Sequence, residues 1–151
     1  MQLDARGIAE ALPHRYPFLF IDRVLDVVPK ESVHARKLVS MSDPILQGHF
    51  PGMPVVPGVV LVETMAQAAV ILSRASDMFD PVTEICFFMS IKDAKFRALV
   101  EPGDVLDVHV QMLRGGRIGK FSGEIRVEGQ LRASANFVAV VEKRPTRDDA
   151  G

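Results

Sequence analysis

The middle of the chain carries its most hydrophobic segment. Between Pro57 and Ala75, apolar residues lie on every side of a helix, and a few polar residues, among them Glu63 and Gln67, interrupt them. A helix that is apolar all round must be buried on most of its sides. Proline suits the first turn of a helix, because the N–H that it lacks would have no partner there. The pattern therefore predicts one long buried helix that begins near Pro57 and ends near Ala75.

Segments with strand-like patterns lie on both sides of this helix. Some are rich in β-branched and aromatic residues, and others alternate apolar and polar residues, as strands with one buried face do. The expected strands span residues 18–28, 32–41, 82–91, 105–113, 119–127 and 131–141. Pro29 and Lys30 separate the first two strands, which indicates a hairpin. Upstream of them, Asp4 can cap a short helix that Pro13 stops.

About six strands, mostly antiparallel, accompany one buried helix, which defines an α+β protein. A curved antiparallel sheet wrapped around the helix satisfies this pattern best. No repeat or Gly/Ser linker divides the chain, and 151 residues fit one ordinary domain. We expect one domain over residues 1–141. The charged segment 142–151 is interpreted as a polar, disordered tail.

The charge and composition argue against several classes of partner. Eighteen basic and nineteen acidic side chains give a formal net charge of -1, which provides no overall field to attract nucleic acid or an anionic membrane. The hydrophobic segment contains polar residues and falls short of the roughly 20 apolar residues that a membrane span needs. The single cysteine, Cys86, cannot form an internal disulfide. We therefore expect a cytoplasmic protein with no nucleic-acid or membrane partner.

The histidines and the cysteine do not form a metal-binding pattern. None of the four histidines has another histidine or a cysteine three or four residues away, so a zinc site is not predicted. Cys86 lies in an apolar segment, which is typical of a core thiol rather than a nucleophile. The chain also lacks G-x-S-x-G, Walker A and G-x-G-x-x-G motifs. We expect neither a metal nor a cofactor.

His49 lies in a constrained segment directly ahead of the long helix. Residues 47–58 contain three prolines and three glycines, and His49 is the only titratable side chain among them. Such a backbone can hold an imidazole in place, and imidazole can act as a base near neutral pH. A histidine that only binds a buried backbone carbonyl explains the pattern equally well. His49 is therefore a candidate base with a structural alternative.

Glu63 is the second candidate, because it interrupts the predicted buried helix. Carboxyl groups are rarely buried unless they are paired or functional, and burial favours the neutral acid that a proton donor needs. Gln67 lies four residues later on the same helix face and can hydrogen-bond the carboxyl group. The alternatives are an ion pair between Glu63 and an arginine of the sheet, and a purely structural network for Gln67.

The beginning of the helix completes a set of groups for one kind of reaction. Gly58 leaves backbone N–H groups accessible there, and these can polarise a carbonyl oxygen as negative charge grows on it. A histidine base, a carboxylic acid and such donors together suit elimination of water from a 3-hydroxyacyl compound. One group removes a C2 proton, another protonates the departing 3-hydroxyl, and the N–H groups stabilise the enolate-like intermediate.

A series of motifs between residues 12 and 141 also resembles the FabZ-type 3-hydroxyacyl-[acyl-carrier-protein] dehydratases. Each motif alone is modest, but the series in this order is specific. The motifs are residues 12–24 (LPHRYPFLFIDRV), 48–51 (GHFP), 54–58 (PVVPG), 63–68 (ETMAQA), 95–97 (KFR) and 102–104 (PGD). The related FabA branch typically carries aspartate where this chain has Glu63, which favours the FabZ branch.

The resemblance implies a fold, an assembly and a reaction. The fold would be the hot-dog fold, in which an antiparallel sheet wraps a long helix. Two protomers would join their sheets, and each site would take His49 as base from one chain and Glu63 as acid from the other, with the Gly58 amide on the substrate carbonyl. Family members commonly form trimers of dimers, and the acyl chain occupies an apolar tunnel. The substrate would be a (3R)-hydroxyacyl thioester on acyl carrier protein in type II fatty acid biosynthesis.

Two further expectations concern substrate recognition. Phe87 and Phe88 are candidate gates of the tunnel, although a core strand explains them equally well. Basic residues can meet the acidic carrier protein, although solvated strand edges commonly carry such charges. The candidate carrier contacts are Lys92, Lys95 and Arg97, and Arg114, Arg117 and Lys120 are further basic residues that could meet the carrier. The motifs leave open the acyl-chain length and a role in the supply of lipid A precursors.

Two rival functions use the same features. A thioesterase on this fold would use the helix N-terminus and the carboxylate to activate water, and it would release a free thiol. A non-catalytic acyl-binding module would need only the apolar tunnel, so the presence of both His49 and Glu63 argues against it.

Overall fold

The computed structural model describes residues 1–146, so residues 147–151 of the expected tail lie outside the described residues. Two helices, one short 3-10 helix and six strands follow one another along this part of the chain. In order they are α1 (Ala5–Ala11), β1 (Arg23–Val28), β2 (Ser32–Leu38), η1 (Pro44–Leu46), α2 (Gly58–Ala75), β3 (Glu84–Phe96), β4 (Val105–Arg114), β5 (Ile118–Val127) and β6 (Gln130–Lys143).

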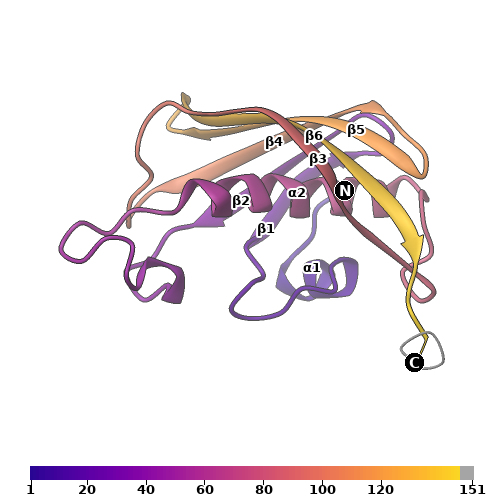
Figure 1. Cartoon of the computed structure of the whole chain (residues 1–151), viewed down its shortest axis with the longest axis horizontal. Coiled ribbons are helices and arrows are strands. Elements are labelled where there is room, and N and C mark those ends of the chain that lie inside the picture. The colour runs from indigo at the N-terminus through magenta and orange to yellow at the C-terminus, as the bar shows by residue number, and fades with distance from the viewer. Residues whose placement is uncertain (147–151) are drawn as a thin grey trace.

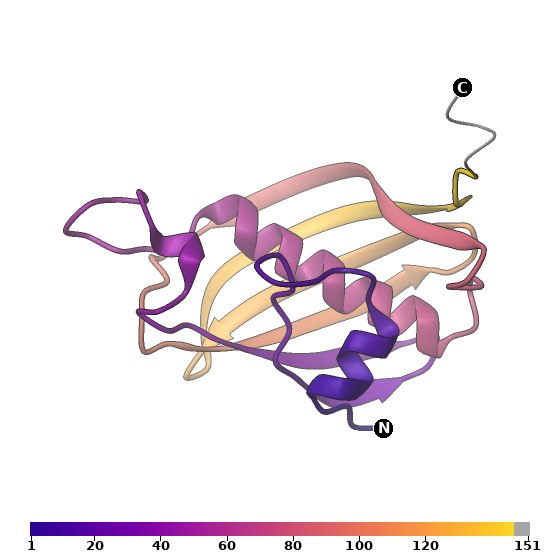
Figure 2. The same ribbon diagram turned by 90° about the horizontal axis from the view of Figure 1, so that it is seen from below.

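The six strands form one sheet in the order β1-β2-β4-β5-β6-β3, and all neighbours are antiparallel. The sheet curves over α2, and α1 lies on the side of α2 away from the sheet (Figures 1 and 2). This arrangement confirms the predicted α+β fold with a central helix inside a curved antiparallel sheet. Within residues 1–146, it also makes β3 an edge strand that pairs with β6 alone.

The core lies between α2 and the concave face of the sheet. Met65, Ala68 and Leu72 of α2 are fully buried against the apolar faces of the strands. Among residues 1–146, α2 is the helix whose length and composition suit a membrane span, but 67% of that segment is buried inside the molecule. Its all-round hydrophobicity is therefore explained by its position beneath the sheet.

Gly123 of β5 allows the helix to approach the sheet closely. A Cβ atom at this position would lie 2.7 Å from the sulfur of Met65 and 3.2 Å from the Met65 Cβ atom. The thioether end of methionine is flexible, but its Cβ atom is fixed to the helix backbone. A side chain at position 123 therefore requires the helix and the strand to move apart.

We expect Gly123→Val to lower the free energy of unfolding by about 1–3 kcal/mol, the usual effect of overpacking a core. Urea unfolding would measure this change from the transition midpoint and slope. Ser122→Val is the matched control, because Ser122 precedes Gly123 on the same strand and points to the opposite face. Equal stability of the two variants would contradict the packing argument.

The main departure from the predicted strands concerns residues 18–22, which precede β1 instead of belonging to it. Phe20 and Ile21 are buried as a strand pattern requires. However, the backbone N–H of Phe20 donates to the side chain of Gln67, and the carbonyl of Phe18 accepts from it. This segment is therefore bound to α2 by hydrogen bonds. An apolar sequence pattern alone cannot distinguish such a segment from a β-strand.

Other strand boundaries differ from the prediction by a few residues. β2 ends at Leu38, three residues before its predicted end, and the next N–H, of Val39, donates to Asp104 instead of a strand neighbour. β3 continues to Phe96, five residues beyond its predicted end, with bulges that keep it paired to β6. β6 reaches Lys143, which lies two residues beyond the expected end of the domain.

A polar cluster covers the outer face of β2 and β4. The rings of His34 and His109 stack with centroids 4.0 Å apart, and His34 Nε2 lies 2.9 Å from Asp107 Oδ1. Arg36 also donates to that carboxylate at 3.1 Å. Burial of the ring and then the charge of His34 lower the pKa of His109 from its ordinary value of 6.5, and Arg126 adds to this, while Asp107 and Glu124 oppose it.

We expect His109 to make the protein less stable as the pH falls below about 6.5, the ordinary histidine pKa. Because the folded pKa is lower than the unfolded one, the unfolded chain binds the proton first in this range. The contribution is present above the unfolded pKa and is lost as the pH falls through the folded pKa. His109→Gln should make the dependence of Tm on pH shallower in this window, and an unchanged slope would contradict the assignment.

Candidate active site

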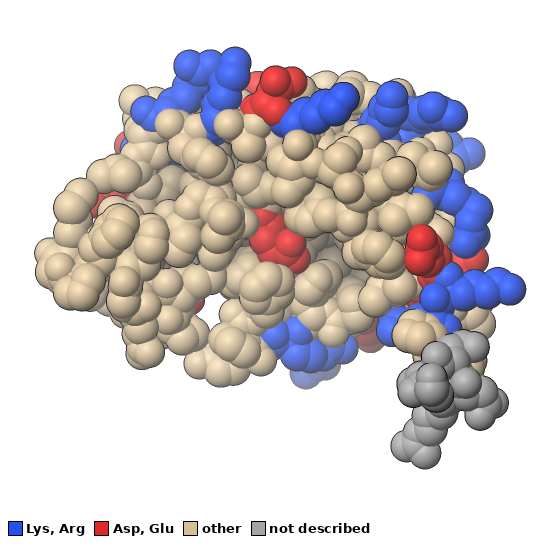
Figure 3. Space-filling model, viewed as in Figure 1, with Lys and Arg blue, Asp and Glu red and all other residues tan. Residues whose placement is uncertain are grey.

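The carboxyl group of Glu63 lies in a partly buried position on α2. Its side chain is 19% exposed, and Oε1 accepts a hydrogen bond from Gln67 Nε2 at 3.2 Å. The same oxygen lies 3.4 Å from Nε2 of His14. Figure 3 shows acidic atoms at a hollow in the middle of a broad uncharged face, with Lys and Arg side chains along its upper, right and lower edges. A lone carboxyl group in such surroundings is well placed to exchange a proton with a bound molecule.

Gln67 holds the polar surroundings of Glu63 in place. Its side chain is fully buried, and its Oε1 accepts from the N–H of Phe20 at 2.9 Å. Its Nε2 donates to the carbonyl of Phe18 at 2.8 Å as well as to Glu63. The amide therefore fixes both the segment before β1 and the orientation of the carboxyl group.

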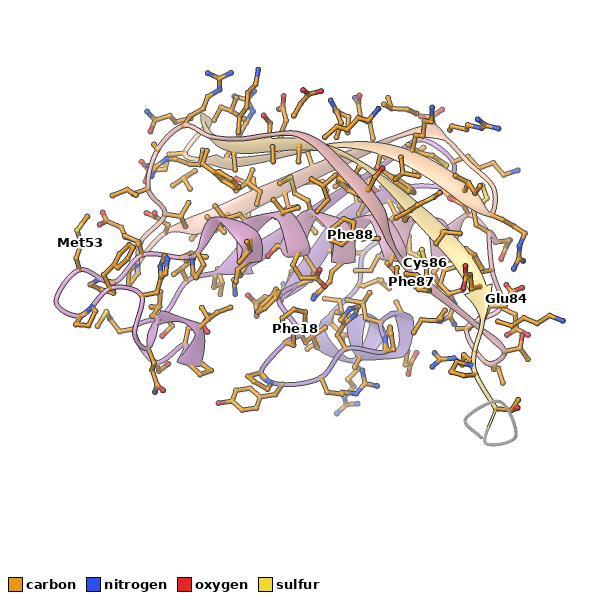
Figure 4. All side chains as sticks on the ribbon, viewed as in Figure 1. Phe18, Met53, Glu84, Cys86, Phe87 and Phe88 are labelled. Atoms are coloured by element: carbon orange, nitrogen blue, oxygen red, sulfur yellow. The ribbon has the colours of Figure 1, made fainter. Side chains whose placement is uncertain are left out.

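An apolar pocket opens beside Glu63, between α2 and the strands β3 and β6. It is referred to below as the Glu63 pocket, and its volume is about 90 Å³. Its lining residues are His14, Glu63, Ala66, Gln67, Val70, Cys86, Phe87, Phe88, Phe137 and Ala139. Figure 4 places the labelled Cys86, Phe87 and Phe88 together on β3. The polar lining groups, which are His14, Glu63 and Gln67, lie beside one another, and the other lining residues are apolar apart from Cys86.

Phe87 and Phe88 have different surroundings in this pocket. The ring of Phe88 packs edge-on against Phe137 at 5.5 Å between centroids. Phe87 is 45% exposed and lies toward the surface. Phe88 thus packs into the side of the pocket, while Phe87 lies at its exposed edge. Cys86 is half-buried, and burial raises the pKa of its thiol to about 11, so it is a poor nucleophile at neutral pH.

His49 is held by backbone groups of its own loop. Its Nδ1 lies 3.0 Å from the carbonyl oxygen of Val55, and its backbone carbonyl accepts from the N–H of the same residue at 3.1 Å. Because a carbonyl only accepts, Nδ1 donates this hydrogen bond, and in the neutral ring the lone pair then lies on Nε2. Among the described residues, Nε2 has no hydrogen-bond partner. The ring therefore satisfies a backbone carbonyl and also presents a free base.

Within one chain, the structure does not bring His49 and Glu63 into one pocket. His49 is absent from the lining of the Glu63 pocket. Its loop, residues 47–57, extends from the body of the molecule beyond the beginning of α2, with Met53 near its tip (Figures 2 and 4). Phe50 and Met53 in this loop are more than half exposed. A loop with such side chains at its surface is suited to packing against another protein surface.

Gly58 begins α2, as the sequence indicates to within one residue. Pro57 precedes it and provides no side-chain cap, while Val60 and Leu61 donate to the Pro57 carbonyl. The N–H of Gly58 has no hydrogen-bond partner among the described residues, as expected for the first turn of a helix. A Cβ atom at Gly58 would meet the ring of Phe96 at 3.0 Å. The ring thus covers the glycine closely.

Of the predicted carrier contacts, Lys92 and Lys95 lie on β3 and Arg97 directly follows it, and none of the three lines the Glu63 pocket. Lys92, Lys95 and Arg97 are exposed. Lys95 and Arg97 also line a shallow polar groove with Asp93 on the outer face of the sheet. Arg117 is engaged in an ion pair with Glu84 at 2.8 Å. Lys92, Lys95 and Arg97 therefore remain available to a partner.

His14 is a site residue that sequence reasoning missed. Besides its contact with Glu63, its Nδ1 is buried without a hydrogen-bond partner in residues 1–146. The sequence feature that could have identified His14 is its position in the motif at residues 12–24. Its closeness to Glu63, however, depends on the tertiary fold. Residues 1–146 contain no cluster of three or more His, Cys, Asp or Glu side chains that could hold a metal ion.

The long helix inside a curved sheet defines this chain as a hot-dog domain. The solved dehydratase heterocomplex ApeI:P from Xenorhabdus doucetiae superposes with a TM-score of 0.76 at 22% identity, covering 95% of this chain and 93% of that one. A hypothetical thioesterase with coenzyme A from Streptococcus pneumoniae gives a TM-score of 0.63 at 14% identity, with coverage of 82% and 87%. At these identities the likeness shows the fold alone.

The sequence relatives are closer. A family model described as a FabA-like domain matches residues 12–136. A 3-hydroxyacyl-[acyl-carrier-protein] dehydratase FabZ from Cereibacter sphaeroides is 45% identical over 144 residues, which cover 94% of this chain and 92% of the relative. A FabZ from Shewanella sp. is 47% identical over 139 residues, with 90% of each covered. The chain belongs to the FabZ family of 3-hydroxyacyl-[acyl-carrier-protein] dehydratases.

Proposed function

We propose that this protein removes water from a (3R)-3-hydroxyacyl thioester on acyl carrier protein and forms the trans-2-enoyl thioester in type II fatty acid biosynthesis. The observation that carries the proposal is the carboxyl group of Glu63, oriented by Gln67 and His14 at the polar side of an apolar pocket. The names and identities of the FabZ relatives support it. Neither a metal nor a redox cofactor is needed for this reaction.

The residues divide the proton transfers between them. His49 Nε2 takes the proton from C2, and the Gly58 N–H donates to the thioester oxygen as negative charge develops there. Glu63 gives its proton to the 3-hydroxyl, directly or through a water molecule. The C2–H and C3–O bonds break, the C2=C3 bond forms, and water leaves. Proton exchange with solvent then returns His49 and Glu63 to their starting states.

The proposal includes a dimer, because one chain keeps His49 apart from the Glu63 pocket. The β3 edge is long and carries exposed apolar side chains, which are Phe87, Met89, Ile91 and Phe96. Exposed edges of this kind are normally covered. Antiparallel pairing of two β3 strands across a twofold axis would join the sheets and bring the His49 loop of one protomer to the partner. Further assembly into a trimer of dimers follows from the family resemblance.

Three finer assignments complete the proposal. Lys92, Lys95 and Arg97 would contact the acidic carrier protein, since they are exposed near the edge of the sheet. A cytoplasmic location fits the free thiol of Cys86, because proteins of oxidising compartments tend to contain disulfides. The catalytic unit would be one domain over residues 1–141.

The test is the ultraviolet absorbance of the conjugated enoyl thioester after the purified protein is mixed with a (3R)-3-hydroxyacyl-carrier-protein substrate. We expect absorbance to rise with time, and a thiol reagent to detect no release of the phosphopantetheine thiol. Thiol release without an enoyl signal would identify a thioesterase instead. Tight binding with an unchanged substrate would identify an acyl-binding module.

A further inference from the structure

A second pocket lies directly behind the Glu63 pocket. It has a volume of about 170 Å³ and is called here the arginine pocket. Its lining residues are Ala9, Glu10, Ala11, Leu12, Pro13, Arg15, Val70, Arg74, Phe79, Pro81, Glu84, Ile85, Cys86 and Arg144. Val70 of α2 and Cys86 of β3 line both pockets. These two side chains therefore form the wall between them.

The two sides of this wall differ in chemistry. Apart from His14, Glu63 and Gln67, the Glu63 pocket is lined by apolar side chains and Cys86. The arginine pocket contains charged side chains, and the guanidinium groups of its three arginines all donate to backbone carbonyls, that of Arg15 to the carbonyls of Ala9, Leu12 and His14. Arg74 donates to the carbonyl of Glu10 at 3.1 Å, and Arg144 donates to that of Pro81 at 3.2 Å. An alkyl chain is stabilised on the first side and would disturb hydrated charges on the second.

The wall lies at a defined distance from the reacting group. Val70 follows Glu63 by seven residues on α2, or roughly 10 Å along the helix axis. The helix faces of these residues coincide, because seven residues make about two turns. A substrate whose C3 lies at Glu63 would extend its acyl chain along α2, and the terminal methyl of a long enough chain would meet Val70 and Cys86.

We propose that Val70 and Cys86 set the longest acyl chain that this protein accepts. The inference rests on the proposed function, since it assumes that the acyl chain enters the Glu63 pocket. Chains that end before the wall gain apolar contact with each added methylene. Longer chains must displace the wall or leave the pocket, so the affinity falls for acyl chains that are too long to end before the wall.

Opening and closing the wall should move this limit in opposite directions. Val70→Ala and Cys86→Ala should shift the preference toward longer chains, and Val70→Leu should shift it toward shorter ones. One methylene in a hydrophobic pocket changes discrimination on the order of tenfold or more. We therefore expect the ratio of the affinity for a longer acyl chain to that for a shorter one to rise by about tenfold in the alanine variants. The same ratio should fall by about tenfold in Val70→Leu.

The measurement is a series of dissociation constants for saturated acyl-carrier proteins that differ by two carbons. These thioesters lack the 3-hydroxyl and cannot be dehydrated. Their dissociation constants therefore show the effect of the wall on chain length independently of catalysis. The same length series of 3-hydroxyacyl substrates then gives kcat/KM ratios. Val62→Ala is the matched control, because Val62 is buried on the same helix and lines neither pocket.

The outcomes separate the wall from the reaction. A shift of the binding limit in opposite directions for Val70→Ala and Val70→Leu, with no shift for Val62→Ala, would establish the wall. An unchanged limit in folded variants, or an equal loss of affinity at every length, would overturn it. A shifted binding limit in a protein that produces no enoyl thioester would keep the wall and reject the proposed dehydration.

Discussion

Alanine in place of His49 is expected to lower kcat for dehydration by about 10²- to 10⁴-fold, the usual contribution of a positioned general acid or base. The reason is the orientation of the ring. Nδ1 donates to the Val55 carbonyl at 3.0 Å. In the neutral ring the lone pair therefore lies on Nε2, which acts as the base. Alanine removes the base, and no other titratable side chain lies within residues 47–58.

Two companion variants separate catalysis from loop structure. His49→Asn provides an amide donor for the Val55 carbonyl but no base, so it should preserve the loop and still lose kcat to a similar extent. His34→Ala is the histidine control, because His34 lies on the outer face of the sheet in the cluster with Asp107. Initial rates of enoyl formation and thermal unfolding would be measured together. Near-normal kcat in folded His49→Asn would reject His49 as the base.

The central helix and the strands with one buried face were predictable because each leaves a local pattern. Residues of α2 are apolar in every direction, and β5 alternates strictly between buried and more accessible positions. Glu63 and Gln67 were identifiable for the same reason, as polar interruptions of a helix that had to be buried. The contact between them follows from their spacing of four residues on one helix face.

The less predictable features depend on which segments meet in space. The apolar sequence of β3 is compatible with a buried central strand, yet β3 forms the sheet edge and leaves Phe87 45% exposed. Strand order is a property of the whole sheet, so it cannot be inferred from the hydrophobic periodicity of one strand. His14 reaches Glu63 only because the segment before β1 is bound to Gln67. The wall at Val70 and Cys86 likewise joins residues from separate elements.

Glutamine in place of Glu63 is expected to lower kcat by about 10²- to 10⁴-fold while leaving substrate binding largely intact. The amide has nearly the same shape as the carboxyl group, and its oxygen can still accept from Gln67 Nε2. It cannot donate an acidic proton to the departing hydroxyl. Kinetic assays should therefore show a fall in kcat with little change in KM, and Glu124→Gln on the outer sheet face is the control. Substantial kcat in folded Glu63→Gln would exclude this residue as the acid.

A mixture of the two inactive chains tests where their groups meet. If each site combines His49 of one protomer with Glu63 of its partner, a mixed dimer of His49→Ala and Glu63→Gln contains one doubly altered site and one intact site. Random exchange at equal concentrations makes half of the dimers mixed, so activity should recover to about a quarter of the wild-type value. Exchange requires that the dimers first be dissociated and reassembled, and the separately treated variants are the controls. A site built within one chain predicts no recovery, because every such site would retain one altered residue.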